Sequence, residues 1–560
     1  MAPTLTLCVL VAVGVCIVSL ILHRIFGRSI LDNIDGPPSN SILTGGFPLT
    51  PTSILCIWPP QENLPAFFDP DGWDFQQDLE ENYGEVVKIR GLLSVCRQFS
   101  LLSTQRNSKK KPEQQLYVFD PVALQSMIVQ QSDAYEEHPI YMKAYGLLWG
   151  PGIQSSIGAD HHRYRKIITP AFATGKIREM IPLFYEVAEK ARDGLISPFV
   201  SHGPRKLDLN NILGRTSLEV IGRTSIGYSF DSMIPGQDTR NEYAETLKEL
   251  FPTVFKFKLF FPFLPRACEI GSAAFRRFVV DMIPSKTLHR ARDMVDLMER
   301  KATQLVMEKK EAVACGQLDI EDDSKDIMTL LLKANLTAEE GMFLTEEELV
   351  GQTGIMISAA TDTTSSALDR IFHSLSLRRD VQDKLRVEIV EAPEHMDYEQ
   401  LGSLPYLDGF IHEVLRLCVI RRNTVTEDNH SFVLGYPPVT PVMNRETVED
   451  TILPLGTPFI GVDGQQITSI PVPKGTTIYI AIQTANRNRR IWGDDALEFK
   501  PERWQNGKAG AQTERLCGIY GNMMTFLGGG RSCLGFQFAL LEIKVIVSVL
   551  LRSFIFSPRR

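Results

Sequence analysis

Residues Met524 to Gly535 constrain this chain more than any other stretch, because they place a cysteine just after a run of glycines. Gly528 to Gly530 allow the backbone to turn tightly and to approach a flat or bulky group. The apolar run from Leu534 to Leu551 is long enough for a buried helix. The sequence therefore predicts Cys533 at a helix N-terminus, where free N–H groups, the helix dipole and the nearby Arg531 favour a thiolate. The alternative is a buried structural cysteine beside a glycine turn.

The same loop fits the pattern Phe-x-x-Gly-x-Arg-x-Cys-x-Gly from Phe526 to Gly535. This string resembles the haem-binding loop of cytochromes P450. The resemblance implies that the Cys533 thiolate is the axial ligand of a haem b iron, with Phe526 and Arg531 also in contact with the cofactor. It also implies the P450 fold, which is mainly α-helical with a smaller β region.

Composition limits the other classes of protein to which the chain could belong. Its 560 residues are 44% hydrophobic, enough for a large core, and its net charge of -8 gives no reason to expect nucleic acid as a partner. The nine cysteines are scattered without paired or zinc-type spacing, which suits a reducing compartment.

The N-terminal sequence predicts a membrane anchor. Leu5 to Leu22 carry no charge, close to the roughly 20 residues that cross a bilayer core. A cleaved signal peptide is the competing interpretation, but no basic segment precedes the run. His23, Arg24 and Arg28 follow it, and the positive-inside rule then keeps the rest cytosolic. We expect a single-pass anchor at 1–28, in the endoplasmic reticulum.

A hinge and one catalytic domain are expected after the anchor. Gly36-Pro37-Pro38 stiffens the hinge at 29–45, because each proline fixes φ and blocks helix continuation. The catalytic domain then occupies 46–560.

Two basic candidates lie in the polar segment Asp160 to Lys166. His161 and Arg165 are one helical turn apart, so both could reach one anionic group. A solvated helix face is the ordinary alternative. The segment resembles the P450 C-helix motif, which implies that both side chains bind a haem propionate. By the same resemblance Arg445 is a further propionate ligand.

A run of hydroxyls and one acid, Ile357 to Ser366, falls within a long helical pattern that Thr345 opens as N-cap. Such side chains compete for the backbone's hydrogen bonds, so amphipathicity alone does not explain them. The run resembles the P450 I-helix signature, with Ala360 in place of the usual glycine. An acid beside a hydroxyl can pass protons to bound oxygen, so Asp362 and Thr363 are the candidate proton-delivery pair.

Glu413 and Arg416, spaced i to i+3, could be an ordinary surface pair. The segment Phe499 to Trp504 resembles the P450 stretch whose arginine joins this pair. Glu413, Arg416 and Arg503 are therefore expected to form a buried structural charge network.

Three stretches depart from the family pattern, near 46–62, 93–112 and 418–436, and they lack amphipathic periodicity. Removing each restores the spacing expected of a P450, which suggests unspliced gene-model sequence. Only 27 residues follow Cys533 in the 560-residue chain, so a C-terminal β hairpin is expected to be absent. The sequons at Asn335 and Asn429 are expected to stay unmodified on the cytosolic side.

The resemblance implies a fungal microsomal-type haem-thiolate monooxygenase. It would insert one atom of O2 into an apolar small molecule, a secondary metabolite, terpenoid, steroid or xenobiotic. The chain has no Gly-x-Gly-x-x-Gly or P-loop stretch, so electrons are expected from an NADPH-cytochrome P450 reductase. The alternatives are an O2-independent P450 isomerase or dehydratase, and a catalytically impaired haem protein from a defective gene model.

Overall fold

A computed structural model describes residues 30–37, 73–90, 114–234, 241–315, 326–336, 341–417, 442–507 and 515–558. The predicted anchor at 1–28 and the three predicted insertions lie outside these residues, so they stay predictions. Among the helices that the structure describes, none is long and apolar enough to cross a membrane.

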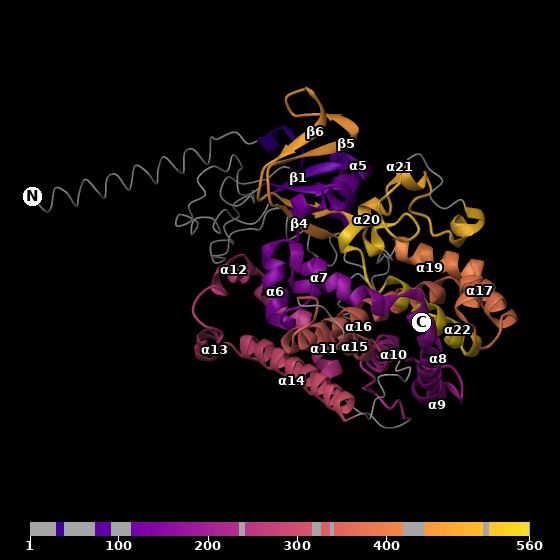
Figure 1. Cartoon of the computed structure of the whole chain (residues 1–560). Helices are drawn as coiled ribbons and strands as arrows, with labels where there is room; N and C mark the ends of the chain where they lie inside the picture. The colour runs from indigo at the N-terminus through magenta and orange to yellow at the C-terminus, as the bar shows by residue number, and fades with distance from the viewer. Residues whose placement is uncertain are drawn as a thin grey trace, which may run out of the picture. The chain divides into compact units, whose positions relative to one another are not determined.

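The chain forms two compact units, and the first comprises 1–136 with 442–484. A five-stranded sheet has the order β1-β2-β7-β4-β3, and β5 pairs with β6 in a separate antiparallel ribbon (Figure 1). Its described elements are η1 (Ile30–Asn33), α3 (Trp73–Tyr83), β1 (Val86–Arg90), β2 (Gln114–Val118), α5 (Pro121–Gln125), η4 (Ser126–Gln130), η5 (Ser132–Ala134), β3 (Tyr135–Glu136), β4 (Met443–Thr447), β5 (Thr451–Ile460), β6 (Gln466–Val472) and β7 (Thr477–Ile480).

The register of the sheet explains its core. β2 runs antiparallel to β1 and parallel to β7, with Leu116 opposite Ile478 and Val118 opposite Ile480. All four of these side chains are fully buried and lie on one face of the sheet, because residues two apart on a strand point to the same side.

The second unit comprises 137–441 with 485–560 and is helical. Its described elements are α6 (Pro139–Trp149), η6 (Ile153–Ser155), α7 (Gly158–Ile168), η7 (Thr169–Phe172), α8 (Thr174–Lys190), η8 (Ala191–Ile196), α9 (Ser197–Val200), α10 (Leu209–Ser225), α11 (Glu242–Val254), η9 (Phe255–Phe263), α12 (Leu264–Ala267), α13 (Ala273–Met282), α14 (Lys286–Ala314), α15 (Ile327–Leu336), α16 (Glu346–Leu377), α17 (Arg379–Glu391), α18 (Tyr398–Gly402), α19 (Pro405–Leu417), α21 (Arg489–Trp492), η10 (Pro501–Gly507), η11 (Met524–Phe526), η12 (Gly529–Arg531) and α22 (Phe536–Ser553). In sequence, α20 (Ile482–Ala485) spans the boundary between the units. A mainly α fold with a smaller β region is confirmed.

Helix α16 is the centre of the second unit, where α6, α10, α14, α17, α19 and α22 all pack against it (Figure 1). It begins with the predicted cap: Thr345 accepts a hydrogen bond from the Glu348 N–H, and the Glu348 carboxylate accepts one from the Thr345 N–H. The hydroxyls of Thr361 and Thr363 donate back to the carbonyls of Ile357 and Ala359 at 2.7 and 2.8 Å. The hydroxyl run is therefore compatible with the helix, because these side chains bond to the preceding turn.

Asn335 has a role inside this unit. Its side-chain amide donates to the Leu344 carbonyl at 2.7 Å, and its oxygen accepts from the Leu344 N–H at 2.8 Å. The amide that a glycan would modify is thus already part of the fold. Asn429 lies outside the described residues.

Candidate haem-thiolate site

The cysteine loop is closed by a backbone hydrogen bond. The Cys533 N–H donates to the Phe526 carbonyl at 2.9 Å. Two residues between them have positive φ, Leu527 at 55° and Gly529 at 61°, so the turn needs glycine at one position and holds a strained leucine at the other. A Cβ added at Gly530 would meet no atom within 4 Å, so this side of the loop is open.

Cys533 departs from the expectation in two respects. Helix α22 begins at Phe536 with Gly535 as its cap, so Cys533 lies before the helix end rather than at it. Its pKa is raised by desolvation in the packed loop, while the Gly535 N–H and the Arg165 charge lower it less. The thiolate expected for the haem-bound protein therefore stays a prediction. A bound metal ion deprotonates a coordinating thiol by itself.

The side chains of two distant segments meet at this loop. The guanidinium of Arg165, on α7, donates to the Ser532 carbonyl at 2.7 Å and to the Ser532 hydroxyl at 2.9 Å. Burial lowers the pKa of Arg165, the Cys533 charge raises it, and the Arg531 charge lowers it again. Arg531 donates to the Ser156 carbonyl at 3.0 Å, and His161 is buried on the same helix as Arg165. The Arg165 charge thus acts on the thiol, and the Arg531 charge acts on Arg165.

These residues fit a haem bound through its iron to sulfur. The Cys533 side chain is exposed, although the loop around it is packed, so the sulfur opens onto accessible space. Its neighbour Gly530 leaves that space free of side-chain atoms. The cations of Arg165 and Arg531 suit the two carboxylates that haem carries. Cys533 would ligate the iron, and the two arginines would hold the propionates.

Asp362 and Thr363 lie in the middle of α16. Desolvation by burial raises the pKa of Asp362 to about 6, and the Lys248 charge opposes that shift. Thr363 is exposed, whereas Thr361 and Thr364 on either side of it are buried. Ala360 is partly exposed. The face of α16 that carries Thr363 therefore borders accessible space, although the helix is packed on its other sides.

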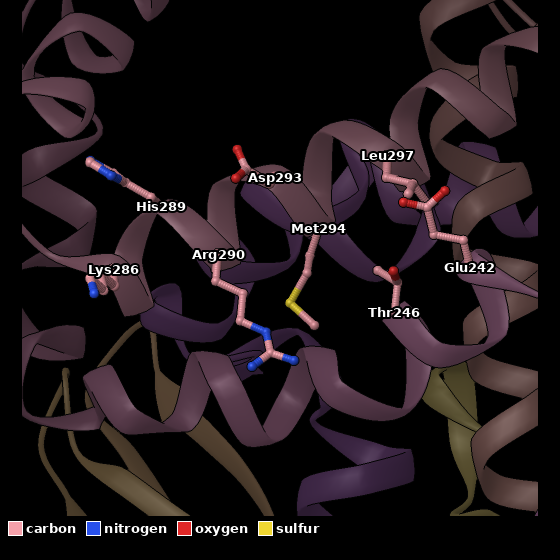
Figure 2. A pocket seen from close by; sticks show the side chains of 8 residues that line it. All are labelled: Glu242, Thr246, Lys286, His289, Arg290, Asp293, Met294 and Leu297. Carbon is pink, nitrogen blue, oxygen red and sulfur yellow. The ribbon is translucent and has the colours of Figure 1, made fainter. Parts of the chain in front are cut away.

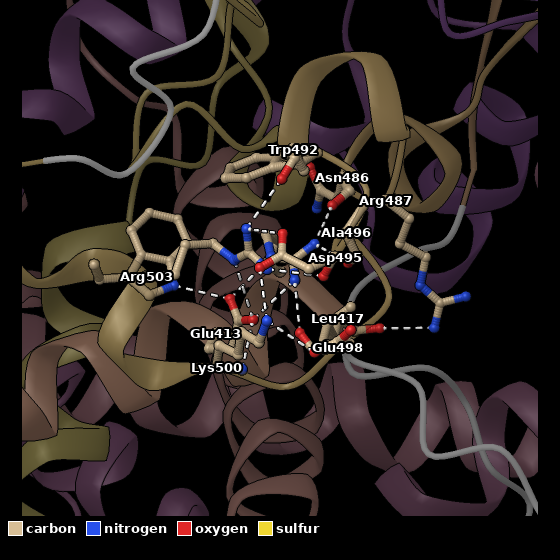
Figure 3. A network of polar contacts seen from close by, with 12 residues as sticks. Glu413, Leu417, Asn486, Arg487, Trp492, Asp495, Ala496, Glu498, Lys500 and Arg503 are labelled. Carbon is tan, nitrogen blue, oxygen red and sulfur yellow. Dashed lines mark hydrogen bonds and ion pairs between the residues drawn. The ribbon is translucent and has the colours of Figure 1, made fainter.

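The structure brings the three members of the expected charge network together. Figure 3 shows the polar contacts around Glu413 and Arg503. Both oxygens of the buried Glu413 carboxylate accept from Arg416, at 2.8 and 2.9 Å, and Arg503 Nε lies 3.5 Å from it. The indole of Trp504 and the backbone N–H of Lys500 donate to the same carboxylate at 2.9 and 3.0 Å. Neither contact was expected from the sequence, because both arise where η10 folds onto α19.

Arg445, the remaining expected propionate ligand, belongs to the first unit. It is buried on β4, and its guanidinium donates to the Asn444 carbonyl at 2.8 Å. The other predicted site residues all belong to the second unit.

A surface pocket of about 370 Å³ lies between α11 and α14 (Figure 2). Its lining is largely charged and contains none of the predicted site residues. The lining side chains are Glu242, Thr246, Lys286, His289, Arg290, Asp293, Met294 and Leu297. It is not the site of the chemistry, because neither the thiol nor the Asp362 face opens into it.

Sequence reasoning missed two polar side chains that act on Asp362 and its helix. Lys248 on α11 and Asp369, two turns beyond Asp362, belong to no motif. A signal existed for Asp369, because positions seven apart lie on one face of a helix. Nothing in the sequence indicates Lys248.

Comparison with known proteins agrees with the geometry. The family model for Cytochrome P450 matches residues 107–427 and 461–560. Cytochrome P450 monooxygenase 91 of Postia placenta is 40% identical over 544 residues, covering 96% of this chain and 90% of the relative. Cytochrome P450 monooxygenase 81 of the same fungus is 38% identical over 552 residues, covering 98% and 90%. Ganoderic acid synthetase of Ganoderma lucidum is 32% identical over 549 residues, covering 96% and 90%.

The family match covers most of the chain, and these relatives align along nearly all of it. P450 enzymes hold their haem iron by a cysteine thiolate. The open thiol in a glycine loop beside two arginines is the arrangement that this cofactor needs. The chain belongs to the cytochrome P450 family of haem-thiolate monooxygenases.

Proposed function

We propose that this enzyme inserts one atom of O2 into an apolar secondary metabolite, with Cys533 as the iron ligand. The observation that carries the site assignment is the exposed Cys533 thiol, in a loop closed by the hydrogen bond from the Cys533 backbone N–H to the Phe526 carbonyl and close to the charge of Arg165. The relative named for ganoderic acid synthesis supports a secondary metabolite as substrate. A terpenoid or steroid skeleton is the substrate class we propose.

When bound, the haem supplies O2 binding and activation. The residues of the chain then control the protons. Asp362 has a pKa of about 6, so near neutral pH both its acid and its carboxylate are populated, and it can give up a proton and take one back. Thr363 presents its hydroxyl on the exposed face one residue further. We assign Asp362 as the proton reservoir and Thr363 as the group that passes the proton on.

We further propose that an NADPH-cytochrome P450 reductase supplies the electrons. The anchor at 1–28 would hold the enzyme at the endoplasmic reticulum, with the catalytic domain in the cytosol. Support for the anchor comes from the uncharged run Leu5 to Leu22.

The iron assignment is tested by a matched pair of cysteine variants. Cys533→Ser should abolish the red-shifted absorption band of the reduced, CO-treated protein, because an alcohol does not replace the thiolate. Cys517→Ser should keep the band: Cys517 is largely enclosed, burial raises its pKa to about 12, and its sulfur contacts Met524. The opposite pattern would contradict the assignment. A wild-type chain without the band would favour the impaired haem protein.

The oxygen chemistry is tested with Thr363→Ala. Loss of a placed proton donor slows its step by about 10²–10⁴-fold, so more of the reducing equivalents should leave as hydrogen peroxide. Product formed per NADPH consumed gives the answer, with Thr361→Ala as the control because Thr361 is buried. Product formation without O2 consumption would instead indicate an isomerase or dehydratase.

A further inference from the structure

A polar stripe runs along α16 from Asp362 toward the C-terminal end of the helix. Asp362, Ser366 and Asp369 follow one another at i, i+4 and i+7, so they share one face of the helix. At 1.5 Å per residue, the two acids lie about 10 Å apart along the axis. All three side chains are partly accessible. The outer acid is bonded at the surface, because the amide of the exposed Asn210 donates to Asp369 at 2.5 Å.

Lys248 reaches this stripe from α11. Its Cε and Nζ would lie 3.4 and 3.8 Å from a Cβ added at Gly214, so the side chain runs over the backbone of α10 at its glycine. Gly214 is one turn beyond Asn210, the partner of Asp369. The Lys248 ammonium therefore lies along the same edge of α10 that holds the outer acid.

The two acids have similar pKa values. Burial raises the pKa of Asp362 to about 6 and that of Asp369 to about 6, and the Lys248 charge lowers both. At Asp369 the Asn210 hydrogen bond and Arg370 also lower the pKa, and Asp208 raises it. Because two acids of similar pKa exchange a proton at little cost in free energy, the stripe is suited to moving protons in either direction.

We propose that Asp369 and Lys248 form the solvent end of a proton route that reloads Asp362. This rests on the proposed function, in which Asp362 and Thr363 deliver protons. Asp369 takes a proton from solvent. The Ser366 hydroxyl accepts that proton and releases its own to the Asp362 carboxylate, so Asp369 returns to its ionised form and one proton moves inward. Lys248 keeps its ammonium throughout and is a positioning residue, which holds both acids in the range where they exchange.

The electrostatic part is tested without turnover, by infrared titration of the protonated carboxyl bands in the purified protein. Asp362→Asn and Asp369→Asn identify the two bands. Lys248→Met should move both titrations upward by as much as about one pH unit, since a nearby opposite charge shifts a carboxyl by that order. Lys248→Arg should restore them. Lys256→Met is the matched control, because that exposed lysine influences neither acid. If the titration of both carboxyl bands is the same in Lys248→Met as in the wild type, the proposed role of the lysine is overturned.

The route itself is tested by coupling in the full enzyme. Asp369→Asn should lower product per NADPH by about tenfold or more and raise the solvent isotope effect on turnover, because proton uptake becomes slower. If Asp362→Asn and Thr363→Ala uncouple while Asp369→Asn and Lys248→Met behave like Lys256→Met, only this route is wrong. If none of the variants uncouples, the proposed proton delivery by Asp362 and Thr363 falls as well.

Discussion

Glu413 on α19 and Glu542 on α22 are both completely buried in the second unit, but their surroundings differ. Glu413 accepts hydrogen bonds from Arg416, the Trp504 indole and the Lys500 backbone N–H, and it forms an ion pair with Arg503. Neither oxygen of Glu542 forms a hydrogen bond within the part of the chain that the structure describes. Desolvation raises the pKa of Glu542 to about 8, and the Ser217 hydroxyl opposes that shift.

The contrast shows that burial alone does not decide what a carboxyl does. With its partners in place, Glu413 links α19 to η10 through its ion pair with Arg416 and its hydrogen bond from Trp504. Without such partners, Glu542 stays protonated at neutral pH and packs as a polar but uncharged side chain. Glu413 therefore stabilises the fold through its charged partners. Glu542 is tolerated in the core only as long as it keeps its proton.

Replacing the acid of the network should have the largest effect. Glu413→Gln leaves Arg416 buried without its counter-charge, and we expect a loss of about 3–5 kcal/mol in the free energy of unfolding. Chemical unfolding of the two proteins measures it. Glu502→Gln is the control, because Glu502 is an exposed acid whose partner is the exposed Lys384. Equal losses in the two variants would mean that the network is no more important than a surface pair.

The buried acid Glu542 should make the free energy of unfolding depend on pH. Its folded pKa of about 8 lies above the unfolded value of 4.5, so the folded protein keeps a proton that the unfolded chain releases. Stability should therefore fall as pH rises from about 4.5 to about 8, by about 1.4 kcal/mol per pH unit from this group. Glu542→Gln removes the contribution. Unfolding midpoints measured across that window should be flatter in the variant, and parallel curves would contradict a protonated Glu542.

Replacing Glu186, an acid at the surface, should have the smallest effect on the free energy of unfolding. Glu186 accepts hydrogen bonds from Arg223 and Lys190, which lower its pKa to about 2, but its side chain is 45% exposed. Solvent screens such pairs, so Glu186→Gln should change the free energy of unfolding by only about 0–1 kcal/mol at neutral pH. Added salt should erase the difference. A loss as large as that of Glu413→Gln would remove burial as the cause of the contrast.

Local features of the site were predictable because each depends on a few adjacent residues. The Thr345 cap and its Glu348 partner are three residues apart, as are Glu413 and Arg416. The cysteine loop fits a short sequence motif, so its turn could be expected from the glycines. The charge state of Cys533 could not, because it depends on the tertiary surroundings of the sulfur and on the metal that the thiol binds.

The sequence by itself determined the class of protein and the order of its parts: the hydroxyl run of α16, the Glu413 pair and the cysteine loop. These are periodic or short-range signals, which neighbouring residues carry without help from the rest of the chain. Tertiary structure alone decided which distant groups meet: Arg165 with Ser532, Trp504 with Glu413, and Lys248 above Gly214. It also decided that Glu542 is buried with no hydrogen bond to its carboxyl oxygens among the residues that the structure describes. Burial and long-range contact arise only when helices pack, and they set the charge of an acid more strongly than its neighbours in sequence do.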